Sequence, residues 1–269
     1  MYPHNHHEAA QPILDVRHLT VRYNGRVALE DLTFHLHEGE RVAVVGPNGA
    51  GKSTLFKVVS GVLPPTSGEV TIFGSRPGGH VCIAYIPQRS QVDWNFPVSV
   101  ADVVMMGRSA KLGPLNWPHK RDWEHVQSAL ETVELSNLAS RQISQLSGGQ
   151  QQRMFIARAL AQEAELMLMD EPLTGLDTPA QESLLNLLDT LQNQKVTVMV
   201  ATHDLDQAAR HFDRMMLLNH RIVAFGRPEK VLQTENLLRA YGARLRSANG
   251  DTILPVDDCC GDETHDHIH

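Results

Sequence analysis

The chain has 269 residues, a length that suits one large or two small domains. Of these residues, 42% are apolar and 20% are charged, a composition typical of globular proteins. The formal net charge of −7 argues against bulk electrostatic attraction to nucleic acid or to an anionic membrane surface. No apolar run approaches the roughly 20 residues of a membrane-spanning helix, and residues 1–7 lack the apolar stretch of a secretory signal. Three cysteines are too few for a disulfide framework, which indicates a reducing compartment.

The first part of the chain has the pattern of a β region. Residues 1–11 are polar and predict a disordered lead. Apolar and polar residues alternate over 13–23 and again around Leu32, Phe34 and Leu36, which predicts strands. A turn then leads into the apolar, β-branched run 41–45, typical of a buried parallel strand.

A glycine-rich loop follows that strand directly. Its pattern is Gly, four residues and Gly-Lys-Ser, and residues 53–60 after it predict a helix that Gly61 ends. The glycines let backbone N–H groups point at phosphate oxygens, and the helix N-terminus adds unpaired N–H groups and its positive dipole. Lys52 is expected on the β- and γ-phosphates and Ser53 on Mg²⁺. The residues predicted to bind nucleotide are Gly46, Pro47, Asn48, Gly49, Ala50, Gly51, Lys52, Ser53 and Thr54.

Two more strands are expected at 70–73 and 81–86, and helical periodicity then dominates from Pro87 to about Gln145. Ser99 is expected to cap a helix that reaches Met106 and ends at Gly107. A second helix is expected over 122–133. The residues predicted on its buried face are Trp123, Val126, Leu130 and Val133.

Sheet character returns after this helical insertion. Strands are expected at 165–170 and 196–201, with a helix opened by Thr178 and Pro179 between them. A hairpin around Asn219 and His220 should close the sheet, and a helical stretch is expected from 228 to about 244. Residues 247–269 predict a flexible acidic tail that contains cysteine and histidine.

Two carboxylates mark the end of the strand at 165–170. In doubly wound sheets, ligands bind at the carboxyl ends of the strands, so Asp170 and Glu171 are placed beside the phosphate loop. Asp170 is expected to orient Mg²⁺ through its water shell, and Glu171 is expected to polarise the water that attacks the γ-phosphate.

The run Leu146-Ser147-Gly148-Gly149-Gln150 predicts a second glycine turn into a helix, whose N-terminus can hold an anion. With this run, the sequence resembles the ATP-binding subunits of ABC transporters over residues 13–244. The resemblance implies an α/β fold of the P-loop NTPase, ABC type. A mixed, largely parallel sheet would form its core, with an antiparallel β subdomain beside it and a helical subdomain of about 88–150 inserted in a domain of 12–246.

The resemblance also implies roles for single residues and a second subunit. Tyr23 would stack on adenine, Gln88 would reach the metal and the water, and His203 would contact the γ-phosphate. The signature Ser147, Gly148, Gly149 and Gln150 would close over the ATP of a second copy, with Asp177 in the loop that crosses the dimer interface. The residues implied to be catalytic are Lys52, Gln88, Glu171 and His203, and those implied to hold Mg²⁺ are Ser53, Gln88 and Asp170.

The resemblance further implies a membrane-spanning permease as partner, a substrate-binding protein acting indirectly, no nucleic acid partner, and a place on the cytoplasmic face of the cell membrane. Residues 91–108 resemble the branch that imports manganese, zinc or iron, with an Asp-Trp and Phe-Pro-Val run. Trp94, Phe96 and Pro97 could dock on the permease or pack inside the helical subdomain.

Two alternatives stay open. An importer of iron chelates (siderophores) or of vitamin B12 would share every ATPase motif, and only residues 93–107 separate it from a metal importer. The histidine- and cysteine-containing ends could bind zinc or stay solvated. The residues concerned are His4, His6, His7, Cys259, Cys260, His265, His267 and His269.

Two other classes are disfavoured. An ATPase of DNA repair or chromosome architecture would need long coiled-coil arms, and the interval 88–145 lacks sustained heptads. A metal-storage protein would leave the nucleotide motifs unexplained.

Overall fold

A six-stranded sheet with the order β5-β6-β7-β3-β8-β9 forms the centre of the protein in the computed structural model, which describes residues 12–76, 83–112, 116–242, 245–248 and 252–255. Neighbouring strands pair in parallel, except β8 and β9, which form the expected antiparallel hairpin. The strands are β3 (Arg41–Val45), β5 (Ile83–Ile86), β6 (Leu166–Asp170), β7 (Thr197–Thr202), β8 (Arg214–Asn219) and β9 (Arg221–Gly226).

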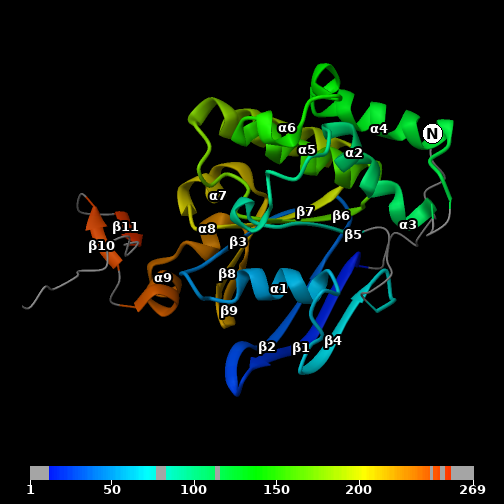
Figure 1. The fold of residues 1–269 in the computed structure, drawn as a ribbon. Helices are drawn as coiled ribbons and strands as arrows, with labels where there is room; N and C mark the ends of the chain where they lie inside the picture. Colours follow the sequence, from blue (N-terminus) through cyan, green and yellow to red (C-terminus); the bar gives the residue numbers. More distant parts are fainter. Residues whose placement is uncertain (1–11, 77–82, 113–115, 243–244, 249–251, 256–269) are drawn as a thin grey trace, which may run out of the picture.

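A second, antiparallel sheet has the order β2-β1-β4 and lies below the central sheet in Figure 1. Its strands are β1 (Leu14–Tyr23), β2 (Arg26–Leu36) and β4 (Ser67–Ile72). The predicted combination of an antiparallel β region and a parallel sheet is therefore confirmed. Strand β4 begins earlier than the sequence indicated, because its first residues pair with β1 although they carry no apolar pattern.

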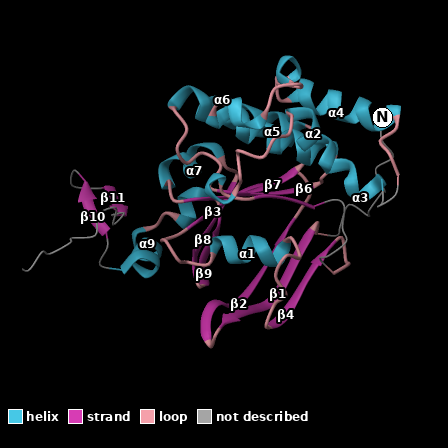
Figure 2. Ribbon diagram, viewed as in Figure 1, coloured by secondary structure: helices cyan, strands magenta, loops and turns pink. Residues whose placement is uncertain are grey.

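Helices cover both faces of the central sheet, as Figure 2 shows in cyan. Helix α1 lies between the two sheets, whereas α2, α4, α5 and α6 lie on the opposite face. Within the described residues, no helix combines the length and hydropathy that crossing a bilayer requires. The helices are α1 (Lys52–Val59), α2 (Val100–Met105), α3 (Ser109–Leu112), α4 (Lys120–Thr132), α5 (Gly148–Ala161), α6 (Thr178–Asn193), α7 (Leu205–His211), α8 (Pro228–Val231) and α9 (Thr234–Tyr241).

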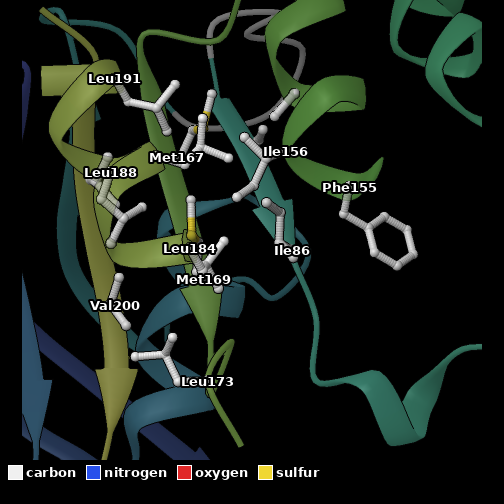
Figure 3. Packing of buried hydrophobic residues seen from close by; sticks show 14 of the residues in the cluster. Ile86, Phe155, Ile156, Met167, Met169, Leu173, Leu184, Leu188, Leu191 and Val200 are labelled. Carbon is white, nitrogen blue, oxygen red and sulfur yellow. The ribbon is translucent and has the colours of Figure 1, made fainter. Parts of the chain in front are cut away.

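The alternation of side chains along each strand divides the interior into two apolar clusters. In β3, Val42 and Val44 face α1 and the antiparallel sheet, whereas Ala43 and Val45 face the helices of the other side. Strand β6 follows the same rule, and Figure 3 shows Met167 and Met169 packed near Leu184 and Leu188 of α6. The strands are thus buried on both faces, which explains their continuous apolar sequences.

Two expectations for the helical insertion are wrong in detail. The helix capped by Ser99 ends at Met105, but a 3₁₀ turn (Met106–Arg108) and α3 continue past Gly107. Gly107 instead allows its own segment to pack closely against α5, because a Cβ at this position would lie 2.3 Å from the carbonyl oxygen of Arg158. Trp123 is 46% exposed, since the buried face of α4 is centred on Val126, Ala129 and Leu130.

The C-terminal part also differs from expectation. The helical stretch predicted for 228–244 is two helices, α8 and α9, with Leu232 and Gln233 between them. Strands β10 (Leu245–Ala248) and β11 (Thr252–Pro255), which overlap the start of the segment predicted as a flexible tail, pair with each other. The lead 1–11 and the histidines and cysteines proposed as metal ligands lie outside the described residues. The described residues contain no group of three or more His, Cys, Asp or Glu side chains arranged to hold a metal.

Candidate nucleotide-binding and hydrolysis site

The glycine-rich loop runs from β3 into α1, as its pattern predicted. Lys52 is 7% exposed, and its Nζ donates to the carbonyl oxygens of Gly46 (2.6 Å) and Pro47 (3.2 Å). Its ammonium group is therefore held over the loop, where it could form a charge-assisted hydrogen bond to a bound phosphate group.

The N-terminus of α1 is left without a side-chain cap. Gly51 occupies the N-cap with φ 100° and has no side chain that could accept from the first turn, whereas Ser99, Ser147, Asp177 and Asp204 cap α2, α5, α6 and α7. Unpaired N–H groups at a helix start are the donors that bind phosphate oxygens. No side chain caps this start, so a bound phosphate group could accept from the N–H groups of the first turn.

The loop is supported from below by the turn between β8 and β9. The N–H of His220 donates to the carbonyl of Ala50 (2.9 Å), and the carbonyl of His220 accepts from the N–H of Glu30 (2.7 Å). A Cβ at Gly46 would lie 2.0 Å from the carbonyl oxygen of Leu218, so only glycine fits between the loop and this strand.

Asp170 ends β6 and is almost fully buried, with 3% of its surface exposed. Burial raises the pKa of its carboxyl group, and hydrogen bonds from the hydroxyls of Ser53 and Tyr85 oppose that shift. Burial and the charge of Asp170 in turn raise the pKa of Tyr85 to about 12, so the phenol stays protonated and donates to Asp170 Oδ2 at 3.4 Å. Ser53 of the loop and Asp170 therefore meet at one point, and their hydroxyl and carboxylate oxygens suit Mg²⁺.

Glu171 lies one residue beyond the end of β6, where its side chain is close to those of Gln88 and His203. Its Oε2 accepts from Gln88 Nε2 (3.4 Å) and from Thr174 Oγ1 (3.3 Å), and its Oε1 lies 4.0 Å from His203 Nδ1. The histidine contact becomes an ion pair only when the imidazole is protonated. Glu171 also has φ 48°, a conformation that is costly for a residue with a long side chain and that often marks functional sites.

The signature run lies at the start of α5. Ser147 is the N-cap, its hydroxyl accepts from the N–H of Gln150, and the Gln150 side chain accepts from the N–H of Ser147. Gly148 lies close to Arg89 and Leu176, and Gly149 lies close to Ala180.

The helix starts of α1 and α5 belong to opposite faces of the central sheet. Leu55 and Phe56 of α1 are in the apolar cluster that contains the antiparallel sheet, whereas Phe155 and Ile156 of α5 are in the other cluster. Figure 1 shows the same separation, with α1 below the central strands and α5 above them. One chain therefore presents the two helix starts that the sequence predicts to bind anions in two different places.

The remaining predicted residues have simpler surroundings. Tyr23 ends β1 and is 43% exposed, which leaves its ring accessible for stacking. Asp177 caps α6 by accepting from the N–H of Ala180 at 3.0 Å. Trp94 packs edge-to-face on Phe155 of α5, with ring centroids 5.6 Å apart, whereas Phe96 is 55% exposed. Of the aromatic pair, Trp94 thus packs within the helical subdomain, and Phe96 stays accessible to a partner.

Sequence reasoning missed two residues that touch the candidate carboxylates, Tyr85 and Thr174. Tyr85 occurs on β5 shortly before Gln88, and its partner Asp170 is on the adjacent parallel strand, so strand pairing alone could have indicated the contact. Thr174 follows Glu171 by three residues, the spacing of a tight turn, and its hydroxyl donates to Glu171.

Comparison with known proteins bears directly on this site. A family model described as "ABC transporter" matches residues 29–174, the region from the first half of β2 to the turn after Glu171. The chain belongs to the ABC transporter family. ATP-binding subunits of this family hydrolyse ATP, so the chain is an ATPase, and the match includes the phosphate loop, the signature and both carboxylates.

Curated members of the ABC transporter family are similar over nearly the whole chain. The manganese transport system ATP-binding protein MntB of Bacillus subtilis is 45% identical, over 86% of this chain and 93% of its own length. The zinc transport system ATP-binding protein TroB of Treponema pallidum is 46% identical, over 90% of both chains. The chelated iron transport system membrane protein YfeB of Yersinia pestis is 42% identical, over 91% of this chain and 84% of its own.

Solved members have the same fold. A metal-chelate type ABC transporter in an inward-facing conformation contains a chain that matches with a TM-score of 0.79 and 31% identity, over 92% of this chain and 99% of that one. A second structure, cbiO1 from Clostridium perfringens, part of the complex cbiONQ, matches with a TM-score of 0.73 and 28% identity, over 85% of this chain and 93% of that one. The predicted fold of ABC type is thereby confirmed.

Proposed function

We propose that this ATPase powers the import of a divalent transition metal, manganese, zinc or iron, through a separate membrane permease. The observation that carries the proposal is the 42–46% identity, over nearly the full length, to relatives named for manganese, zinc and chelated iron transport. The chain would act at the cytoplasmic face of the membrane, bound to that permease and served indirectly by a substrate-binding protein. Phe96 and Pro97 are exposed and lie within residues 91–108, the run that resembles metal importers, so they would contact the permease.

The contacts of Asp170 and Glu171 support the roles that the resemblance implies for the site residues. Lys52 and the uncapped start of α1 bind the β- and γ-phosphates, while Tyr23 stacks on adenine. Ser53, Asp170 and Gln88 would hold Mg²⁺, which neutralises charge on the phosphates when it is bound. Glu171 accepts the proton of the attacking water, Gln88 reaches the metal and the water, and His203 contacts the γ-phosphate.

A second copy of the chain would complete each site. Because α1 and α5 start on opposite faces of the sheet, the signature of one copy would meet the nucleotide held by the phosphate loop of the other. Ser147, Gly148, Gly149 and Gln150 would then contact the γ-phosphate, and Asp177 would lie near the dimer interface. Hydrolysis removes the γ-phosphate and with it these charge-assisted contacts, so the dimer can open again.

Whole-cell elemental analysis tests the proposal. Cells that carry Lys52→Ala or Glu171→Gln in place of the wild-type chain are grown at limiting metal and compared with wild type. We expect a selective fall in manganese, zinc or iron in both variants, because one cannot hold the phosphates and the other cannot activate water. Arg121→Gln, an exposed change on α4, is the control and should leave metal content unchanged.

Unchanged uptake of all three free metals in both variants would contradict the proposal. A fall limited to chelated iron or to a vitamin would instead support the second candidate, an importer of iron chelates or vitamin B12. The observation that favours this candidate is the similarity in fold to the metal-chelate type transporter.

A further inference from the structure

We propose that Arg89 is a positioning residue that couples Gln88, beside the Glu171 carboxylate, to the start of the signature helix α5. The inference rests on the proposed roles of Gln88, Glu171 and the signature run. Arg89 itself touches neither the phosphate loop nor the carboxylates in the contacts described below. Its importance would come from joining two parts of the site that lie on different elements.

The side chain of Arg89 is bound to the first turns of α5. Its Nε donates to Gln151 Oε1 at 2.6 Å, and Gln151 is 4% exposed. The guanidinium also fits against the signature glycine, because a Cβ at Gly148 would lie 3.0 Å from Nη1. A charge-assisted hydrogen bond to a buried amide is strong and directional, so Arg89 and the start of α5 should move together.

The backbone of Arg89 is bound to the same helix by a second route. The indole Nε1 of Trp94 donates to the carbonyl of Arg89 at 3.1 Å, and the Trp94 ring lies edge-on to Phe155 of α5. The guanidinium carbon lies 6.0 Å from the Trp94 ring centroid, within reach of a cation–π contact. The side chain of Arg89 contacts α5 directly, and its carbonyl group contacts α5 through Trp94.

The other side of the connection is the peptide bond to Gln88. Gln88 Nε2 donates to Glu171 Oε2 at 3.4 Å, a long contact that binding of nucleotide and Mg²⁺ would rearrange. A shift of the Gln88 backbone would displace the adjacent Arg89, whose side chain and carbonyl contact α5 directly or through Trp94. The signature run would thereby be positioned according to what occupies the carboxylate site.

Steady-state ATPase kinetics of the purified full-length chain test this coupling. We expect Arg89→Gln to lower kcat about tenfold while KM for ATP stays within about twofold, because Lys52 and the start of α1, which are proposed to hold the nucleotide, are untouched. Arg89→Lys should recover most of the loss, since its ammonium reaches the position next to Nε and can still donate to Gln151. Arg121→Gln, an exposed arginine of the same subdomain, is the matched control and should behave as wild type.

Trp94 fluorescence supplies a readout that does not depend on turnover. In a chain with Trp117→Phe and Trp123→Phe, both exposed positions, Trp94 is the sole tryptophan. We expect Mg²⁺ and ATP to change its emission in this background, and Arg89→Gln to abolish most of that change. Wild-type kcat in Arg89→Gln, a matching rise of KM, or an unaltered emission response would overturn the inference.

The result is distinguishable from a failure of the proposed function. If Glu171→Gln and Lys52→Ala keep full ATPase activity, the proposed site roles are wrong. If those two variants are inactive and Arg89→Gln equals wild type in both kcat and emission, only the role of Arg89 is wrong.

Discussion

At the scale of single residues, the two adjacent carboxylates of the site, Asp170 and Glu171, differ in how they reduce the stability of the fold. Asp170 is buried among Ser53, Tyr85 and the strands, so its charge is poorly solvated and the pKa of its carboxyl is raised. Glu171 is more accessible but has a left-handed backbone that costs about 1–3 kcal/mol in such residues. Both residues thus lower stability where function needs them, one through desolvation and one through its backbone.

The raised pKa of Asp170 predicts how stability depends on pH. A group whose pKa is higher in the folded than in the unfolded state stabilises the fold below its ordinary value, here 3.8, and that contribution is lost as the pH rises through the folded value. Asp170→Asn, which removes the charge and keeps the shape, should therefore raise the Tm by a few degrees near neutral pH. The gain should shrink as the pH falls through the raised pKa of Asp170, because the carboxyl group is then itself protonated.

Thermal unfolding of the nucleotide-free chain measures this effect. Asp206→Asn, at an exposed position in the first turn of α7, is the control and should show no gain of that kind. A lower Tm of Asp170→Asn at neutral pH would mean that the ionised carboxylate is a net source of stability through its hydrogen bonds.

At the scale of elements, periodicity predicted where helices and strands lie, and Val126, Leu130 and Val133 are buried as predicted, whereas the prediction for Trp123 is wrong. Asp122 and His125 are among the buried residues of α4, because Asp122 pairs with Arg108 and burial lowers the pKa of His125 and keeps it neutral. Trp123, the most apolar residue of its first turn, faces outward instead. Such an arrangement depends on a partner 14 positions away, which a hydrophobic pattern cannot indicate.

Gly107 gives a prediction at the same scale. In a helical turn with free space, Gly→Ala would stabilise by about 1 kcal/mol through propensity alone. Because the new methyl group would meet the Arg158 carbonyl of α5, we expect Gly107→Ala to destabilise the chain by about 1–3 kcal/mol. Urea denaturation gives the sign directly, and a stability at or above wild type would show that the turn shifts to admit the methyl group.

Motifs predicted which elements carry the candidate site, but only some of the contacts between its residues could be predicted from the sequence. The loop, the strand ends and the signature follow from spacing, and the structure places each on the expected element. The left-handed conformation of Glu171 and the hydrogen bond between Arg89 and Gln151 have no local pattern. Both depend on packing between segments that are distant in the sequence and meet only when the chain folds.

At the scale of the whole molecule, the separation of α1 and α5 by the central sheet predicts an ATP-dependent dimer. We expect Glu171→Gln, which should bind ATP without hydrolysing it, to form a dimer with ATP and Mg²⁺ and to remain a monomer without nucleotide. Adding Ser147→Glu should prevent the dimer, because the new carboxylate repels the phosphates of the second copy. A negative charge at the start of α5 is favourable to that helix, so folding should be preserved.

Analytical ultracentrifugation combined with an ATP-binding assay separates the possible outcomes. The Ser147→Glu variant should bind ATP as tightly as its parent, since the phosphate loop is on the other face of the sheet. A dimer that persists in this variant, or a loss of ATP binding by the monomer, would contradict the arrangement in which two copies share each nucleotide.

The support of the phosphate loop by the β8–β9 turn has a consequence for biosynthesis. Gly46 and Ala50 are made early, whereas their supports Leu218 and His220 come about 170 residues later. At the usual elongation rates of about 5–20 residues per second, the loop waits roughly 10–35 seconds on the ribosome before these contacts can form. The nascent chain should therefore acquire affinity for ATP only near the end of its translation, and cellular ATP cannot assist the folding of its first two-thirds.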